Sequence, residues 1–331
     1  MNRTIFLLFV LAVVVSPASA AEPKEKVDQS AERKFRVNYA ATVIGLPAAA
    51  EVRIWVPVPQ TSDDQTVKVI ERDLPGEVEE GTEEKFGSRM VSIQLAAPAS
   101  GEIGLSTSYQ IVRKEVRGLP PEKMGMGRVK LTDEQRKILL GADSKVPVDG
   151  KPLELLKGVS LPADQLQLAR LLYDRVDDHV KYDKSRPGYG RGDVLWVCDS
   201  RFGNCTDFHS LFISLARAKG LPARFEIGFS IPEKRGEGPI TGYHCWAFFY
   251  LEKQGWVPVD ISEADKNPTL KEYYFGNLTE NRVTYSQGRD LTLVPKQAGE
   301  PLNFFIYPYV EVDGKPWPAE KVKLEMTYKD E

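Results

Sequence analysis

The fold is decided by residues 203–260, which contain GNCTDF (203–208), HCW (244–246) and GWVPVD (255–260). Within and after the first motif, apolar residues recur at three- and four-residue spacing: Phe208, Leu211, Phe212 and Leu215. This spacing predicts a helix with one buried face, and Asn204 or Thr206 can cap its start. Cys205 is therefore expected at a helix N-terminus, where the helix dipole and the free N–H groups favour a thiolate over a thiol.

Alternating apolar residues predict three strands after this helix, over residues 223–231, 244–251 and 256–260. If the last two strands pair as a hairpin with a three-residue turn, Asp260 faces Trp246 and shares a sheet face with His244. A carboxylate in that position can hold the imidazole while the imidazole addresses the thiol of Cys205. This combination indicates cysteine-nucleophile chemistry.

Four motifs resemble the core of the transglutaminase-like superfamily: GNCTD at 203–207, LPARF at 221–225, HCW at 244–246 and GWVPVD at 255–260. The order Cys, His, Asp and the spacings of 39 and 16 residues fit that core, and the resemblance covers roughly residues 165–265. It implies a papain-like catalytic triad of Cys205, His244 and Asp260. The chain departs from the family at Cys245, where a small alanine is more common, so a second thiol is expected beside the site.

Such a triad supports acyl transfer on protein or peptide amides through a Cys205 thioester, in a cysteine protease, an amidase or a transglutaminase. The alternative is a non-catalytic binding module that uses the same core as a scaffold. The backbone N–H of Cys205 is the first candidate oxyanion donor. Trp196 either offers its indole N–H to the site or packs under the helix, and Trp246 is a second candidate for lining it. The glycine-rich segment 232–243 is either a mobile flap over the cleft or an ordinary surface loop.

The three cysteines of the chain, Cys198, Cys205 and Cys245, leave at least one thiol unpaired. A disulfide between Cys198 and Cys245 would spare Cys205, whereas a disulfide from either of them to Cys205 would act as a redox lock. A zinc site drawn from these thiols, His209 and His244 is a third alternative, but the spacings match no common zinc signature. We expect no metal and no cofactor.

The domain organisation follows from the change in pattern along the chain, and we expect an α+β protein. Short alternating strands separated by turn residues predict a β-sandwich domain over residues 34–115, and a connector follows over 116–160. A transglutaminase-like domain is expected over 161–331, with an antiparallel sheet and a helix that bears the nucleophile. Its C-terminal strands are expected to close on the core sheet.

An apolar run after Arg3 and the sequence ASA at 18–20 predict a signal peptide over residues 1–20. Its removal takes away Arg3 and no acidic residue, so the formal charge changes from −3 to −4. Such a mildly acidic chain has no general electrostatic attraction for nucleic acid or anionic lipid. With no second long apolar stretch, we expect a bacterial, periplasmic or secreted protein without membrane insertion after cleavage. The sequence leaves its oligomeric state open.

Overall fold

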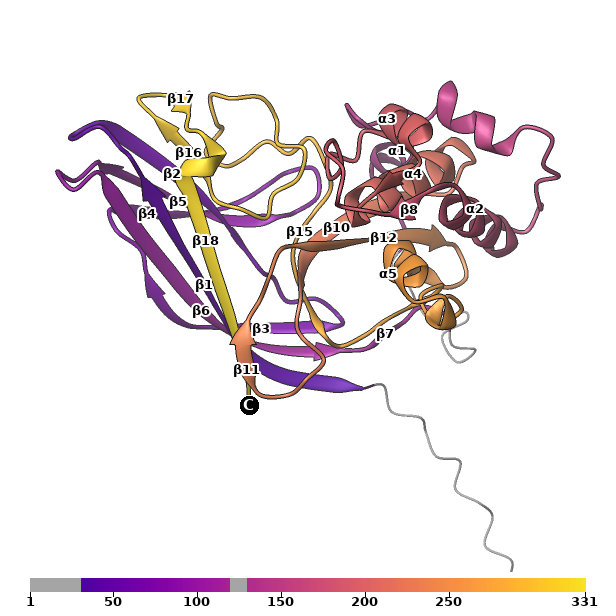
Figure 1. Ribbon diagram of the computed structural model, residues 1–331, viewed down its shortest axis with the longest axis horizontal. Helices are drawn as coiled ribbons and strands as arrows, with labels where there is room; N and C mark the ends of the chain where they lie inside the picture. Colours follow the sequence, from indigo (N-terminus) through magenta and orange to yellow (C-terminus); the bar gives the residue numbers. More distant parts are fainter. Residues whose placement is uncertain (1–30, 120–129) are drawn as a thin grey trace, which may run out of the picture.

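The computed structural model describes residues 31–119 and 130–331, so the predicted signal peptide lies outside the described residues. The chain forms two lobes (Figure 1): a β-sandwich on the left, and helices over an antiparallel sheet on the right. The predicted α+β class is confirmed. A single hydrophobic cluster runs through both lobes, and Tyr285 of the right lobe packs against Tyr39 and Tyr109 of the sandwich, with ring centroids 5.6 and 6.3 Å apart.

The sandwich consists of two five-stranded sheets. The first has the order β11-β18-β1-β6-β3, formed by β1 (Glu32–Ile44), β3 (Gln65–Asp73), β6 (Glu102–Lys114), β11 (Glu237–Pro239) and β18 (Val322–Asp330). The second has the order β17-β16-β2-β5-β4, formed by β2 (Glu51–Val58), β4 (Glu77–Thr82), β5 (Arg89–Ala96), β16 (Tyr309–Val312) and β17 (Lys315–Pro316). In β1 every second side chain is buried, as the alternating sequence predicts.

The C-terminal strands belong to the sandwich, so the expectation that they close on the core sheet is wrong. β18 pairs with β1 from Phe35↔Asp330 to Val43↔Val322, and β16 pairs with β2. Alternation along the sequence identified these segments as strands and showed which face is buried. It carries no information about the partner strand, because any half-buried strand has the same period.

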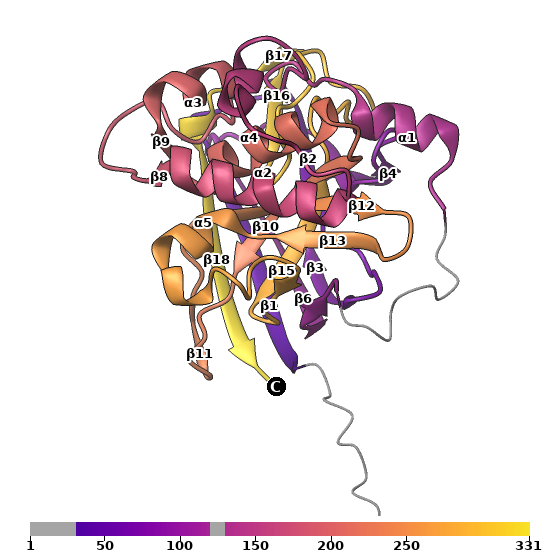
Figure 2. The same ribbon diagram turned by 90° about the vertical axis from the view of Figure 1, so that its right-hand side faces the viewer.

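The second lobe has a four-stranded sheet of order β13-β12-β10-β15. Its strands are β10 (Ala223–Ser230), β12 (His244–Leu251), β13 (Gly255–Val259) and β15 (Arg282–Gln287). Its helices are α1 (Asp133–Leu140), α2 (Gln165–His179), α3 (Val194–Ser200), α4 (Cys205–Ala218) and α5 (Ile261–Lys266). Two short pairs complete the lobe: β7 (Val116–Arg117) with β14 (Asn277–Leu278), and β8 (Lys181–Tyr182) with β9 (Phe202–Gly203). α4 contacts both α2 and the strands β10 and β12, so it lies between helix and sheet (Figure 2).

The segment 232–243 joins the two lobes and is partly paired with the sandwich, so it is more than an unattached surface loop. Its strand β11 pairs with β18, and Ile240 N–H donates to the carbonyl of Met326 (2.9 Å). Arg33 reinforces this junction: its guanidinium makes two hydrogen bonds to Asp330 (2.7 and 3.0 Å) and one to the carbonyl of Pro232 (2.7 Å). The sandwich therefore holds the segment that leads into His244.

Replacing Arg33 with alanine should lower the free energy of unfolding by about 3 kcal/mol, because Asp330 and the carbonyl of Pro232 lose the charge-assisted hydrogen bonds that the buried guanidinium donates. Arg36 is a matched control on the same strand: its side chain is 47% exposed and pairs with Glu331. Arg36→Ala should change stability little. Urea unfolding measures both variants, and equal losses would contradict the proposed junction.

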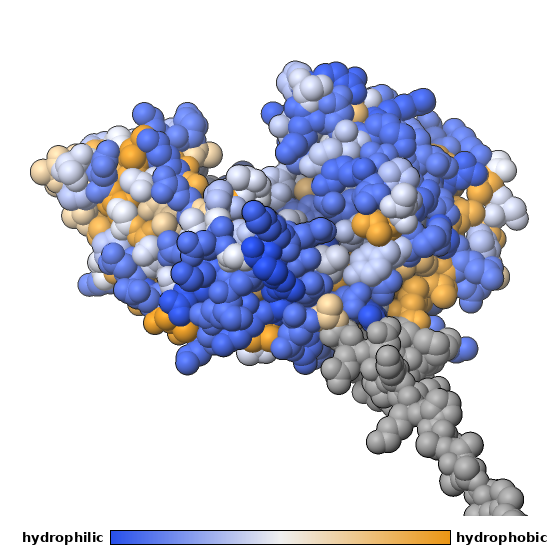
Figure 3. Space-filling view, turned by 60° about the horizontal axis from the view of Figure 1, so that its bottom comes forward, coloured by the Kyte–Doolittle hydropathy of each residue, from blue (hydrophilic) through white to orange (hydrophobic). Residues whose placement is uncertain are grey.

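Hydrophilic side chains predominate on the face shown in Figure 3, and a notch separates the two lobes there. Within residues 31–119 and 130–331, no helix combines the length and the apolar character needed to cross a bilayer.

Candidate active site

Cys205 is the first residue of α4, and a capping box fixes the start of that helix. The Asn204 side chain accepts a hydrogen bond from Thr206 N–H (2.9 Å), and the Asp207 carboxylate accepts one from Asn204 N–H (2.9 Å). Gly203 is required because a Cβ atom there would lie 2.4 Å from Oδ2 of Asp207. The predicted helix and its Asn204 cap are confirmed.

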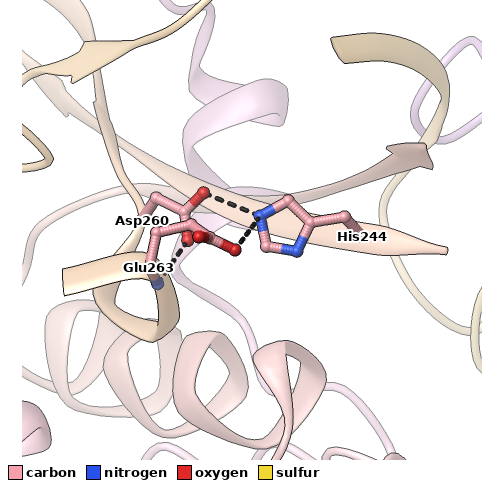
Figure 4. A group of neighbouring side chains, drawn as sticks. All are labelled: His244, Asp260 and Glu263. Atoms are coloured by element: carbon pink, nitrogen blue, oxygen red, sulfur yellow. Dashed lines mark hydrogen bonds and ion pairs between the residues drawn. The ribbon is translucent and has the colours of Figure 1, made fainter. Parts of the chain in front are cut away.

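The hairpin of β12 and β13 brings His244 and Asp260 together. The strands pair from Leu251↔Gly255 to Ala247↔Val259, which is the register predicted from the sequence. Nε2 of His244 lies 2.7 Å from Oδ2 of Asp260 (Figure 4), and both side chains are buried. Since Nε2 is engaged by the carboxylate, Nδ1 is the ring nitrogen left for the Cys205 thiol.

Asp260 is held by several groups besides His244. It is the N-cap of α5, and its Oδ1 accepts hydrogen bonds from Glu263 N–H (3.2 Å) and from the Ser262 hydroxyl (3.1 Å). Its Oδ2 also accepts a hydrogen bond from the buried guanidinium of Arg282 (3.2 Å). Arg282 comes from β15 and was not found from the sequence, since nothing in its local pattern distinguishes it from any other strand arginine.

Cys205, His244 and Asp260 shift one another's pKa values. Burial raises the pKa of the Cys205 thiol, but interactions with Cys245 and His244 outweigh burial and lower this pKa well below its usual value. Burial likewise opposes the charge on His244, yet the Asp260 carboxylate and Cys205 raise its pKa to about 10. The pKa of Asp260 is lowered despite burial, by His244 and Arg282. The arrangement therefore favours a thiolate beside an imidazolium at neutral pH.

Residues 154–261 match the transglutaminase-like superfamily. The chain therefore contains a transglutaminase-like core over these residues. A Haemophilus influenzae protein named as an uncharacterized protein is 34% identical in an alignment 183 residues long, which covers 46% of this chain and 50% of that protein. YebA, an uncharacterized protein of Bacillus subtilis, is 28% identical in an alignment 82 residues long, which covers 22% of this chain and 11% of YebA. The chain thus spans about half the length of the first relative.

A solved structure has the same overall fold as this chain. It is a Cytophaga hutchinsonii protein named as a candidate cysteine protease, with a TM-score of 0.55 and 18% sequence identity. The match covers 91% of this chain and 99% of that chain. At this level of identity the likeness shows the fold alone, and it includes the sandwich as well as the transglutaminase-like core.

Two further residues tie neighbouring segments to the first turn of α4. The Asp207 carboxylate accepts hydrogen bonds from the N–H groups of Gly190 (2.7 Å) and Gly192 (2.9 Å). The hydroxyl of Tyr243 lies 3.0 Å from Nδ2 of Asn204 and 2.9 Å from Oγ1 of Thr206. The loop before α3 and the residue before His244 are therefore both held against the turn that carries Cys205.

His209 is a buried neighbour of Cys205 and Asp260 in the transglutaminase-like core. Its Nε2 accepts a hydrogen bond from Ile261 N–H (3.0 Å) and lies 3.7 Å from Oδ1 of Asp260. Burial lowers the pKa of His209 to about 4, so the ring is neutral at pH 7. Its position four residues after Cys205 puts both on one helix face, although the sequence had pointed to His209 only as a ligand in the zinc alternative.

The two tryptophans singled out from the sequence have different environments. The indole N–H of Trp246 donates to Oε2 of Glu226 (3.1 Å), and the side chain is completely buried. Trp246 is thus a packing neighbour of His244, with ring centroids 5.8 Å apart, and its N–H is not free for an oxyanion. Trp196, in α3, packs edge-on against Phe202 at 5.2 Å, which supports the packing alternative for this residue.

All three cysteines are free thiols, so the alternative of a disulfide between Cys198 and Cys245 does not hold in this structure. In the part of the chain that the structure describes, one group of side chains has the proximity of metal ligands: His244, Asp260 and Glu263, within 4.8 Å of one another (Figure 4). It contains none of the cysteines of the zinc alternative. His244 and the Arg282 cation already bind Oδ2 of Asp260. The ion pairs of Asp260 with these two residues therefore explain why the three side chains lie together, without a metal.

Iodoacetamide should label Cys205 at nearly the same rate at pH 6 as at pH 8, because its pKa is lowered and the reactive thiolate persists. For a thiol with an ordinary pKa, the alkylation rate falls roughly 100-fold from pH 8 to pH 6. His244→Gln is the control, since loss of the imidazolium should make the labelling rate of Cys205 depend steeply on pH. Peptide mapping at several pH values follows the rate, and a steep dependence in the unaltered protein would refute the thiolate.

Proposed function

We propose that this protein catalyses thiol-dependent acyl transfer on protein or peptide amides through a Cys205 thioester. The observation that carries the proposal is the buried contact between Nε2 of His244 and the Asp260 carboxylate (2.7 Å), which leaves Nδ1 for the nucleophile. We further propose that the protein is exported, on the strength of the predicted signal peptide.

The proposed mechanism begins with the thiolate–imidazolium pair. The Cys205 thiolate attacks the carbonyl carbon, and the oxyanion that forms is stabilised by the backbone N–H of Cys205. That N–H is in the first turn of α4, where no intrahelical acceptor exists. Nδ1–H of His244 then protonates the leaving amine, and a thioester remains on Cys205.

The second half of the reaction decides between two activities. If water attacks the thioester, His244 accepts a proton from it and the protein is a protease or amidase. If a primary amine attacks, the product is a new amide and the protein is a transglutaminase. Asp260 orients the imidazole in both halves and stabilises its positive charge.

The test is incubation of the purified protein with a peptide-rich substrate such as casein, with and without a fluorescent primary amine. New N-termini or released ammonia without amine incorporation indicate hydrolysis, whereas fluorescent casein indicates acyl transfer to amines. If the folded, unalkylated protein gives neither product, although iodoacetamide labels Cys205 in a separate sample, the proposal is refuted. The non-catalytic binding scaffold would then be the better account.

A further inference from the structure

A second thiol lies at the site and has no part in the proposed mechanism. Cys245 follows His244 in β12, and neighbouring strand residues point to opposite sheet faces. Its Sγ is 3.7 Å from Oγ1 of Thr206 and 3.7 Å from Nδ1 of His209. Since these two residues belong to the same helical turn as Cys205, the Cys245 thiol packs directly against the turn that carries the nucleophile.

The pKa values of the two neighbouring thiols are shifted in opposite directions. The pKa of Cys205 is lowered for the reasons given above, which favours its thiolate, whereas burial and the Cys205 charge raise the pKa of Cys245 well above its usual value. A thiolate is the form that peroxides oxidise, and an adjacent thiol is the group that captures the oxidised product.

We propose that Cys205 and Cys245 form a reversible oxidation site, in which a peroxide oxidises Cys205 and Cys245 then closes a disulfide that switches the site off. The proposal rests on the proposed function in one respect: it takes Cys205 as the reactive nucleophile.

The steps balance with hydrogen peroxide as the oxidant. The Cys205 thiolate attacks one peroxide oxygen, so an S–O bond forms, the O–O bond breaks, and hydroxide leaves and becomes water on protonation. The sulfur loses two electrons and the peroxide gains them. The Cys245 sulfur then attacks the Cys205 sulfenic acid: the S–S bond forms, the S–O bond breaks, and the hydroxyl group leaves as water with the Cys245 proton. A dithiol reductant reverses the disulfide.

His209 assists the second step. Its Nε2 accepts the Ile261 N–H, so the neutral ring carries its proton on Nδ1, which faces Sγ of Cys245. That N–H can donate to the sulfur and stabilise it as it loses its proton. Oxidation of Cys205 also removes the negative charge that raised the pKa of Cys245. Cys245 is therefore unreactive while Cys205 is reduced, and is activated once Cys205 is oxidised.

The experiment treats the reduced full chain with hydrogen peroxide and follows intact mass and peptide maps. The unaltered protein should lose about 2 Da and yield a peptide that links Cys205 to Cys245, and dithiothreitol should reverse both changes. Cys245→Ala should instead gain about 32 Da at Cys205, as a sulfinic acid that dithiothreitol does not reverse. Cys198→Ala is the matched control and should behave like the unaltered protein, because burial raises the pKa of Cys198 to about 11.

Uptake of oxygen on Cys205 without the linked peptide would overturn the proposal, as would reversible oxidation in Cys245→Ala. If that variant does not fold, judged by circular dichroism, the peptide map of the unaltered protein decides alone. The readout is independent of turnover. A linked peptide in a protein without amide activity refutes the proposed function only, and turnover without a linked peptide refutes the oxidation site only.

Discussion

Replacing Cys205 with alanine should reduce amide turnover by at least roughly 10³-fold, because loss of a nucleophile removes the covalent route and leaves only binding and oxyanion stabilisation. The thioester needs the sulfur at the start of α4, beside His244. The other two thiols cannot take its place: Cys245 faces Thr206 and His209, and Cys198 lies in another helix. The measurement is kcat/KM on a peptide amide.

Cys198→Ala is the control for this variant, since it also removes one small buried thiol and should leave turnover within about twofold. Circular dichroism must show that both variants are folded. A folded Cys205→Ala protein with unchanged cleavage or crosslinking would exclude Cys205 as the nucleophile. The binding scaffold would then remain as the explanation for the transglutaminase-like core.

Much of the candidate site could be predicted because its signals are local. The helix that begins at Cys205 is predicted by two signals within residues 204–215: the cap at Asn204 and the spacing of the apolar residues after Cys205. The short turn between β12 and β13 fixes a register that carries Asp260 to His244. A further local signal was overlooked: Asp193 caps α3, its carboxylate accepting a hydrogen bond from Trp196 N–H at 3.3 Å.

The rest depends on contacts between distant parts of the chain. Arg282 reaches Asp260 only because β15 pairs with β10, and a strand sequence does not specify its neighbour. The same limit explains why the C-terminal strands were assigned to the wrong sheet. β4 could not be predicted for another reason: it is an acidic, mostly exposed edge strand without apolar alternation, and it forms because β5 offers it hydrogen-bonding partners.

Asp260→Asn should lower turnover by about 10² to 10⁴-fold while Cys205 and His244 remain in place. An amide can still accept a hydrogen bond, but it lacks the charge that raises the pKa of His244 to about 10. The imidazolium should then be lost at lower pH, so the alkaline limb of the pH–rate profile moves toward about 6.5. The raised pKa of His244 also stabilises the unaltered fold. This contribution is fully present below about pH 6.5 and is lost as the pH rises toward 10.

The same substitution leaves the Arg282 guanidinium buried without its carboxylate, which should lower the free energy of unfolding by about 3–5 kcal/mol. The double variant Asp260→Asn/Arg282→Met removes both charges and should regain much of that stability, because a buried apolar side chain needs no partner. The double variant should regain no turnover, since it still lacks the carboxylate that orients His244 and keeps its imidazole protonated. Urea unfolding and kcat/KM measured on the same samples separate the two effects. If turnover recovered together with stability, the loss in Asp260→Asn would be one of folding, and Asp260 would have no place in the catalytic triad.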